Sequence, residues 1–296
     1  NITVKYLYVA AQVGRLPPNS GAEGPPNAIT TETGDNAIMN TGLVFSHMFV
    51  EGSCQSFFIR QTRGCIVEYC ATDKTSGQTL GDGSGWHGEN VNCFYIFAPI
   101  VRHCHFRNAY NGASGYPAGG GTGVIAIADV HAGCQIYGNV FESYYSGNGA
   151  IAAGWANDNL LVYNNTFVNA PSGTGPCVRF TSEAINYAAT GNVAYNNLAV
   201  NCANTTYNGI GTFGNNSVLP TTALVNHAGG NYKLAAATAA GVTLSSPFNT
   251  DRLGVTRGAD GVWDRGAYEF SSTGGVGDTN VPTVSITAPT NNAVIS

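Results

Sequence analysis

The sequence predicts an all-β fold, a parallel β-helix, and the main evidence is a short phrase that recurs four times between residues 101 and 202. The copies are VRHCHFRN from Val101, IYGNVFES from Ile136, VYNNTFVN from Val162 and AYNNLAVN from Ala194. They are too short for helices, and they are rich in the β-branched and aromatic residues that favour strands. Each copy therefore indicates a short strand, a tight polar bend and a second short strand.

The spacing of the copies indicates stacked coils of unequal length. The copies start 35, 26 and 32 residues apart (101 to 136, 136 to 162 and 162 to 194), as expected when each is one coil with loops of different size. In three copies the bend carries Asn: Asn139, Asn165 and Asn197. Asn tolerates left-handed backbone and bonds the backbone of its own turn, so we expect these side chains to stack in a column. An inward aliphatic residue before the bend and an inward aromatic residue after it would fill the core of such a solenoid.

This phrase, with Asn at the bend and Phe after it, resembles the right-handed parallel β-helix superfamily, which includes pectate-lyase-like and other polysaccharide-active proteins. The resemblance covers roughly residues 1–235. It implies a secreted protein that faces carbohydrate. It does not define the activity, because one fold hosts many functions.

The repeat also suggests a division of the chain. Residues 203–230 keep the composition of the coils but lose the phrase, so we assign the β-helix to residues 1–230 and expect the coils to end within 203–230. Residues 231–270 resemble a C-terminal segment common in secreted β-helix proteins, which ends in D-x-G-A-Y-E. Because the end of a solenoid exposes apolar surface and unpaired strand edges, we expect 231–270 to cap it. The matching residues are Asp264, Gly266, Ala267, Tyr268 and Glu269.

The last 26 residues differ from the rest. Residues 271–280 are a Gly- and Ser-rich linker, and residues 281–296 show the alternation of a strand. This strand resembles the first strand of the immunoglobulin-like modules of secreted bacterial proteins, so we expect the parent polypeptide to continue beyond Ser296. Alternatively, Val281–Ser296 is an exchanged strand that adds to a neighbouring subunit and mediates self-association.

Composition and charge argue against two classes of partner. The net charge is −5, and only 10% of the residues are charged, so the basic footprint of a nucleic-acid-binding protein is absent. No apolar run reaches the roughly 18 residues needed to span a membrane. The chain opens on a strand without an initiator Met, and we expect a processed protein that is secreted or lies at the cell surface.

The eight cysteines leave two alternatives open. They fit an oxidising compartment if they pair as disulfides, and Cys177 and Cys202 are 25 residues apart, about one coil. Alternatively, several are free thiols that fill the interior of the solenoid as small hydrophobic groups.

The resemblance to lyases of this fold implies a calcium-dependent site. Such enzymes use Ca²⁺ held by Asp or Glu, together with Arg or Lys, to neutralise a uronic acid and remove its C5 proton. Lys74 and Arg107 are the candidate bases, and the motif GWHGEN adds His87 and Glu89 as catalytic candidates. The candidate Ca²⁺ ligands are Asp73, Glu89, Asp129 and Glu142.

Two other chemistries compete for the same region. Glu89 and Asp129 on adjacent coils would suit a glycosidase, which needs two carboxyl groups about 5 to 9.5 Å apart. His103 and His105, with a histidine from a neighbouring coil, would suit a transition metal. That metal site fails if the bend falls at residues 103–104, because the two imidazoles would then diverge.

Outward residues near the loops have both structural and functional interpretations. Arg107 and Glu142 occupy the same step of successive copies, so we expect them to be neighbours on an outward face, either as a surface ion pair or as part of a site. Several aromatic side chains would either stack against pyranose rings or simply pack the loops. These are Trp86, Tyr110, Tyr116, Tyr144, Tyr145 and Trp155.

We therefore expect an extracellular β-helix module of a larger secreted protein that binds an acidic polysaccharide, with or without cleaving it. If it is an enzyme, a polysaccharide lyase or a glycoside hydrolase is expected. The alternative is a non-catalytic structural, filament-forming or adhesive surface protein that uses the rigid solenoid as a rod.

Overall fold

The structure is a computed structural model. It describes residues 2–10, 28–31, 39–53, 55–75, 78–79, 85–86, 88–109, 123–131, 133–181 and 190–271.

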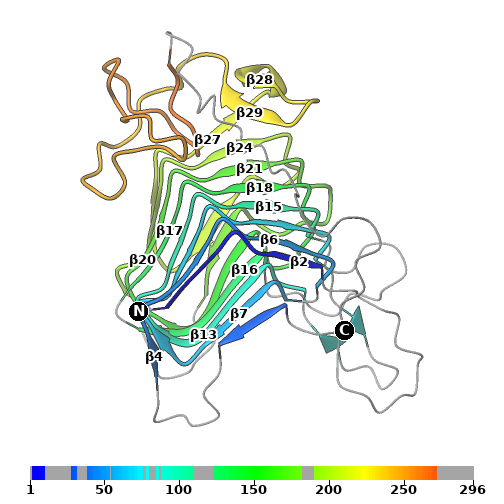
Figure 1. The fold of residues 1–296 in the computed structure, drawn as a ribbon. Helices are drawn as coiled ribbons and strands as arrows, with labels where there is room; N and C mark the ends of the chain where they lie inside the picture. Colours follow the sequence, from blue (N-terminus) through cyan, green and yellow to red (C-terminus); the bar gives the residue numbers. More distant parts are fainter. Residues whose placement is uncertain are drawn as a thin grey trace, which may run out of the picture.

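Three parallel sheets, which we name A, B and C, run along a solenoid (Figure 1). Sheet A contains β1 (Ile2–Lys5), β5 (Leu43–Ser46), β9 (Ile66–Glu68), β14 (Ile100–Arg102), β17 (Cys134–Tyr137), β20 (Leu160–Tyr163), β23 (Val193–Tyr195) and β26 (Thr212–Gly214). Sheet B contains β2 (Tyr8–Ala10), β6 (Phe49–Glu51), β10 (Ala71–Asp73), β15 (His105–Arg107), β18 (Val140–Glu142), β21 (Thr166–Val168), β24 (Leu198–Val200) and β27 (Ser217–Leu219).

Sheet C completes each coil. It contains β3 (Ile29–Thr31), β7 (Phe57–Arg60), β13 (Val91–Phe97), β16 (Ile125–His131), β19 (Ile151–Asn157), β22 (Val178–Phe180) and β25 (Tyr207–Gly209), with β4 (Asn40–Thr41) and β8 (Thr62–Arg63) attached beside β13. The remaining elements are two antiparallel pairs and one 3₁₀ turn: β11 (Gln78–Thr79) with β12 (Gly85–Trp86), β28 (Leu224–Asn226) with β29 (Asn231–Leu234), and η1 (Thr221–Ala223). Among the described residues, no helix is long and apolar enough to cross a membrane.

The predicted parallel β-helix is confirmed, and the repeated phrases stack in register. Val101 pairs with Ile136, Ile136 with Val162, and Val162 with Ala194. Five positions later in three of the copies, the phenylalanine rings stack inside the solenoid, with centroid distances of 5.3 Å between the first and second and 4.9 Å between the second and third. Burial of these like residues above one another supplies the continuous core, and the rings are Phe106, Phe141 and Phe167.

The bend between sheets A and B holds one residue with positive φ in each coil. Polar or aromatic residues occupy it in most coils, and a glycine does so where the bend is crowded. A Cβ on Gly138, whose φ is +65°, would lie 2.6 Å from Nδ1 of His103, so no larger residue fits there without a shift. The full set is Tyr6, His47, Tyr69, His103, Gly138, Asn164, Asn196 and Asn215.

The residue after this bend forms the predicted asparagine column. Oδ1 of Asn165 accepts hydrogen bonds from the backbone N–H and from Nδ2 of Asn139, both at 3.0 Å. Asn165 in turn donates from the same two groups to Oδ1 of Asn197, and Asn197 donates to Oδ1 of Asn216 at 2.9 and 3.0 Å. Each Nδ2 also donates to a carbonyl of the preceding coil, as Asn165 does to Ile136 at 2.9 Å. The column, which we call the asparagine ladder, therefore satisfies buried backbone groups that a bend leaves unpaired.

One further coil follows the last recognised copy of the phrase, and the coils end at β27, within residues 203–230. β25, β26 and β27 pair in parallel with β22, β23 and β24. Its phrase, FGNNSVL from Phe213, keeps the two asparagines but has an aromatic residue in place of the aliphatic start and Val218 in place of the Phe. The ladder asparagine, not the apolar pattern, identifies this coil.

The cysteines are free thiols in the structure, so the disulfide alternative is not supported. Seven cysteines lie in the described residues, and six of them are buried; Cys54 lies outside the described part. Burial raises the pKa of the Cys134 thiol to about 12, which keeps it protonated and unreactive near neutral pH. These side chains fill the solenoid interior as small hydrophobic groups.

The C-terminal segment packs along the side of the solenoid instead of covering its end. Leu224, Tyr232, Leu234 and Ala267 pack on the outward side chains of sheet B. Phe248 packs on sheet A against the rings of Tyr137 and Tyr163, which are in register on adjacent strands, with each ring centroid 4.9 Å away. The outward residues of sheets A and B that this segment covers are Tyr137, Val140, Tyr163, Val168, Leu198 and Val200.

The D-x-G-A-Y-E residues hold this segment together and attach it to the coils. The Glu269 carboxylate accepts from the backbone N–H of Gly258 at 2.6 Å and lies 3.5 Å from the buried Arg257. Gly266 donates from its backbone N–H to the carbonyl of Asn196 at 2.8 Å. A Cβ at Gly266, where φ is +102°, would lie 2.8 Å from Oγ1 of Thr166. The motif is therefore a structural one, used where the segment crosses the bend between sheets A and B.

Candidate functional site

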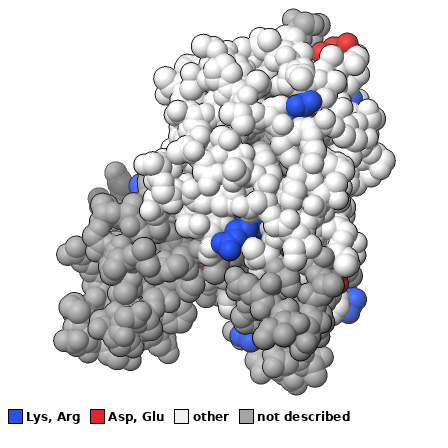
Figure 2. All heavy atoms as spheres, turned by 180° about the vertical axis from the view of Figure 1, so that it is seen from behind, with Lys and Arg blue, Asp and Glu red and all other residues white. Residues whose placement is uncertain are grey.

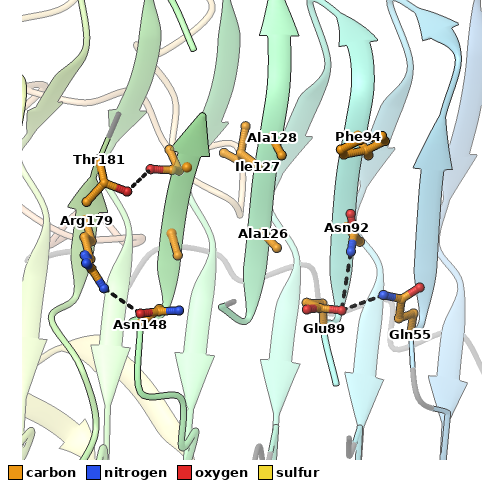
Figure 3. Close-up of a pocket in the computed structure, with 13 residues that line it drawn as sticks. Gln55, Glu89, Asn92, Phe94, Ala126, Ile127, Ala128, Asn148, Arg179 and Thr181 are labelled. Carbon is orange, nitrogen blue, oxygen red and sulfur yellow. Dashed lines mark hydrogen bonds between the residues drawn. The ribbon is translucent and has the colours of Figure 1, made fainter. Parts of the chain in front are cut away.

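A groove lies on the outer face of sheet C (Figure 3). Its volume is about 280 Å³, close to the lower limit for small-ligand pockets. It extends along the solenoid axis from β7 to β22. Its lining residues are Gln55, Glu89, Asn92, Phe94, Ala126, Ile127, Ala128, Asn148, Ala152, Ala153, Gly154, Arg179 and Thr181.

The floor of the groove consists of very small outward residues on two adjacent strands. Ala126 and Ala128 on β16 pair in register with Ala152 and Gly154 on β19. Alternate residues of the same strands point inward to the core, as period-two alternation requires. Because successive strands lie about 4.8 Å apart, this floor forms a shallow trough between larger residues on β13 and β22.

An aromatic ring and a guanidinium stand on opposite sides of this floor. Phe94 on β13 pairs in register with Ala128, and the guanidinium carbon of Arg60 lies 5.4 Å from the centroid of its ring. Arg179 on β22 pairs in register with Ala152, and its Nη1 donates to Oδ1 of Asn148. In Figure 3, Arg179 and Asn148 lie at one end of the groove and Glu89 lies at the other.

Glu89 is a buried carboxylate held by amide side chains. Nε2 of Gln55 donates to its Oε2 at 2.6 Å, and Nδ2 of Asn92 lies 3.4 Å from the same oxygen. The three residues come from the starts of two adjacent coils, and the strands that follow fix their positions. The groove thus has an anionic end at Glu89 and a cationic end at Arg179.

Sheet C carries more positive than negative charge on its described outer face, although the whole chain is acidic. Its outward guanidinium groups belong to Arg60, Arg63 and Arg179, and the carboxylate that lines the groove is Glu89. Charged side chains are sparse elsewhere too: Figure 2 shows a described surface that is mostly uncharged, with a few isolated Lys and Arg groups. An anion that approaches the groove therefore meets cations against a weakly charged background.

Four of the predicted site residues lie together, but on sheet B. Asp73, Arg107 and Glu142 follow one another in register on β10, β15 and β18, which confirms that Arg107 and Glu142 are neighbours. Their ion pairs are different from the expected one: Arg107 lies 3.4 Å from Asp73, and Glu142 lies 2.8 Å from Nε2 of His105. Lys74 follows β10 and pairs with Glu51.

These sheet B side chains are paired with one another. Burial lowers the pKa of His105, although the Glu142 carboxylate opposes that shift. Burial opposes ionisation of Glu142, yet hydrogen bonds from His105 and Tyr232 lower its pKa below the usual value. Partly exposed pairs of this kind contribute little net free energy. The row is a ladder of ion pairs along one face, and Glu89 lies on a different sheet.

The predicted calcium ligands are not brought together in the described part of the chain. Arg107 lies between Asp73 and Glu142 in the register of sheet B, and Glu89 belongs to the groove on sheet C. Among the described residues, no three His, Cys, Asp or Glu side chains gather as they would around a metal ion. The backbone of Asp129 lies in β16, but its side chain, like all of His87, is outside the described part.

The two histidines diverge, as expected for a bend at residues 103–104. His103 is buried at the bend with its ring stacked on Tyr69, with centroids 5.1 Å apart. His105 lies on the outer face of sheet B beside Glu142. The hypothesis of a metal site at these two residues is therefore wrong.

Of the predicted sugar-stacking aromatics, Tyr144 is fully buried and packs against Phe141 and Phe167. It has no face open to a ligand, whereas Tyr145, the other of these aromatics with a described side chain, is partly exposed. Trp86 and Trp155 lie in β12 and β19 with side chains outside the described part, and Tyr110 and Tyr116 lie wholly outside it.

The sequence reasoning did not identify Phe94 and Arg179 as site residues. The alternating small residues of IAIAD and IAAGW were a sign in the sequence of a trough on the outer face.

Comparison with known proteins assigns no activity to this groove. No protein-family model matches the chain, and a search of the curated proteins finds no match. The chemistry that the site supports is therefore inferred from its own residues.

Proposed function

We propose that the solenoid binds an acidic polysaccharide in the groove on sheet C. The observation that carries the proposal is the Ala and Gly floor, in register across β16 and β19, between the ring of Phe94 and the guanidinium of Arg179. A floor without large side chains lets a flat ring approach the sheet closely. The groove follows the solenoid axis, so a linear polymer would lie across successive strands.

Each side of the groove supplies a contact that a charged sugar needs. The Phe94 ring, which the Arg60 guanidinium approaches, borders the floor, and the C–H groups of a pyranose ring pack well beside aromatic side chains. Arg179 is a planar donor that matches the geometry of a carboxylate or sulfate. Asn148, which orients Arg179, has an amide group that can bond sugar hydroxyls. The ligand class is therefore a polymer of uronic acids or sulfated sugars.

Cleavage of the polymer is not part of this proposal. The groove has one carboxylate among its described lining residues, Glu89, whereas a glycosidase uses two carboxyl groups. The predicted lyase bases, Lys74 and Arg107, lie on sheet B in ion pairs. Binding is the activity that this geometry supports.

Two substitutions test the groove. Gly154→Phe fills the trough, and the open space around a Cβ at this position makes the change compatible with folding. Arg179→Gln removes the cation. We expect Gly154→Phe to abolish binding and Arg179→Gln to weaken it at least about tenfold, because a hydrogen bond to a charged group is worth about 1.5–3 kcal/mol. Binding is measured by calorimetry or affinity electrophoresis with polygalacturonate, alginate and a sulfated glycan.

The matched control is Thr30→Phe, which places the same ring on an exposed outward position of β3, outside the groove lining. It should bind like the unmodified protein. A neutral polymer should bind more weakly than the acidic ones, and added salt should reduce the difference. The proposal is wrong if no acidic polymer binds, or if both groove variants bind as tightly as the control.

A further inference from the structure

The C-terminal end of the solenoid is uncovered in the described part of the chain. β25, β26 and β27 are the last strands of their sheets. Val218, which continues the inward row of Phe167 and Ala199, is 57% exposed, and Phe213, which continues the inward row of Val162 and Ala194, is only partly buried. The segment that follows packs on the side of sheets A and B. The end therefore presents three unpaired strand edges and apolar interior side chains, which natural proteins usually cover.

The asparagine ladder is also incomplete at this end. At each earlier step, the next Asn accepts from the backbone N–H and from Nδ2 of the one before it. Asn216 accepts from Asn197 and donates from Nδ2 to the carbonyl of Ala194 at 2.9 Å. Among the described residues, no acceptor follows Asn216. A strand that completes this end should bring an amide or carboxyl oxygen to the ladder position.

The chain contains one more segment with the required pattern. Thr290–Ile295 has the sequence TNNAVI, beside GNNSVL at residues 214–219 and NNLAV at residues 196–200. Aligned on the paired asparagines, Asn292 takes the ladder position and Val294 the inward position held by Val218. Asn291 takes the place of residues that have φ of +54°, +58° and +48° in the last three coils: Asn164, Asn196 and Asn215.

We propose that residues 288–295 add to the C-terminal end of the solenoid as a further strand, bend and strand, with Asn292 accepting from Asn216. Residues 288–290 then pair in parallel with β26, and residues 293–295 with β27. Val294 covers Val218, and the ladder gains the acceptor that it lacks. This contact is independent of the groove on sheet C.

Pro289 fits this placement. In the equivalent strand β26, Thr212 donates its backbone N–H to the carbonyl of Asn192, and the carbonyl of Gly214 accepts from Asn196. Phe213, between them, directs its N–H away from the preceding coil, because N–H groups alternate in direction along a strand. Pro289 aligns with Phe213, so the missing N–H would point outward. Proline is tolerated at such a place on an edge strand and blocks the addition of another strand.

The occupant is the tail of the same chain. The side chain of Arg265 donates to Oγ of Ser217 at 2.7 Å, so the C-terminal segment runs beside the last coil. The 16 residues from 272 to 287 can span up to about 50 Å, enough to return to the end of the solenoid. A tethered strand has an effective concentration in the millimolar range, which favours its own solenoid over that of a neighbour at micromolar concentration.

Hydrogen exchange on the 296-residue chain tests the proposal. Peptides covering residues 288–295 and 212–219 should exchange at least tenfold more slowly than the linker at 272–280, because both would be hydrogen bonded. Asn292→Leu removes the acceptor, and Val294→Asp places a charge at the inward position. Each should release residues 288–295 and speed the exchange of those amides of 212–219 that do not bond the preceding coil. The control Asn280→Leu makes the same change in the linker and should leave protection unaltered.

The outcomes are distinct. Protection that persists from 1 to 100 μM protein, with a monomeric mass, supports docking within one chain. Protection that appears only with a dimer or polymer overturns the assignment to the same chain and makes the occupant the tail of a second copy, which would build filaments. Exchange of residues 288–295 at the rate of the linker, or equal protection in Asn292→Leu and Asn280→Leu, overturns the proposal. Loss of glycan binding in the groove variants has no bearing on this result.

Discussion

Replacing Asn165 with alanine is expected to lower the free energy of unfolding by about 3 kcal/mol or more. The change removes the acceptor of the backbone N–H of Asn139, one of the two acceptors of its Nδ2, and a donor to the carbonyl of Ile136. Each buried polar group without a partner costs about 1–3 kcal/mol. The ladder also loses its bond from Nδ2 of Asn165 to Asn197. For a chain of this size, the loss corresponds to a fall in Tm of roughly 6–12 °C.

Thermal and urea denaturation followed by circular dichroism measure this effect. The control is Asn208→Ala on β25, an exposed outward residue that should change the free energy of unfolding by less than about 0.5 kcal/mol. Equal stability of the two variants would show that the ladder does not hold the coils together. A fragment of the solenoid that melts separately in Asn165→Ala would place the weakness at this coil, since a repeat protein is stabilised coil by coil.

The second large effect is a loss of stability in acid that depends on His103. Burial, reinforced by the positive charges of Arg252, Arg102 and Arg257, lowers the pKa of His103 to about 3. Its Nδ1 is buried without a hydrogen-bond partner. An unfolded histidine has a pKa of about 6.5, so the unfolded chain binds the proton more readily between these two values. The stability that depends on a neutral His103 is therefore complete above about pH 6.5 and falls as the pH decreases towards 3.

His103→Asn should remove this dependence. Asn suits the positive φ of +56° at this position, as in the later coils, and it does not titrate. Between pH 7 and pH 4, the unmodified protein should lose about 3 kcal/mol more stability than the variant. Urea denaturation at both pH values gives the difference. An identical decrease in the two proteins would mean that His103 becomes protonated without cost.

The position of His103 also predicts which part of the structure loosens first in acid. Arg252 donates to the carbonyls of His103 and Cys104 at 3.4 and 3.5 Å, and it belongs to the segment packed along the side of the solenoid. A protonated ring would repel this guanidinium. The side segment should therefore loosen before the coils do, and its amides should exchange faster at pH 4 than those of sheet C.

The repeat was recognisable from sequence because its determinants are local. The two asparagines, the inward residue before them and the inward residue after them occupy fixed steps within eight residues, and stacking only repeats them. The phrase in the coil at 207–219 was not recognised because Phe213 and Val218 replace the usual aliphatic and aromatic residues. Its ladder asparagine, Asn216, was the signal that remained.

The candidate site was harder to predict because it depends on which sheet each residue enters. Glu89, Arg107 and Glu142 were grouped by their positions along the chain, yet Glu89 precedes a strand of sheet C while the other two lie on sheet B. A coil has three outward faces, and a residue count alone does not assign a residue to one of them when loops differ in length. The trough also depends on the small outward residues of its floor, namely Ala126, Ala128, Ala152 and Gly154.

By itself, the sequence determined the architecture: short strands, polar bends at a regular step, and a column of asparagines whose hydrogen bonds require coils to stack in parallel. The tertiary structure alone decided which outward residues share a face. It placed Arg179 across an alanine floor from Phe94, paired Arg107 with Asp73, and laid the D-x-G-A-Y-E segment on the side of the solenoid. The physical reason is that burial fixes each inward residue within its own coil. An outward site, in contrast, combines residues from several coils. The lengths of the loops decide which outward residues become neighbours, and the segments packed on the solenoid decide which of them remain exposed.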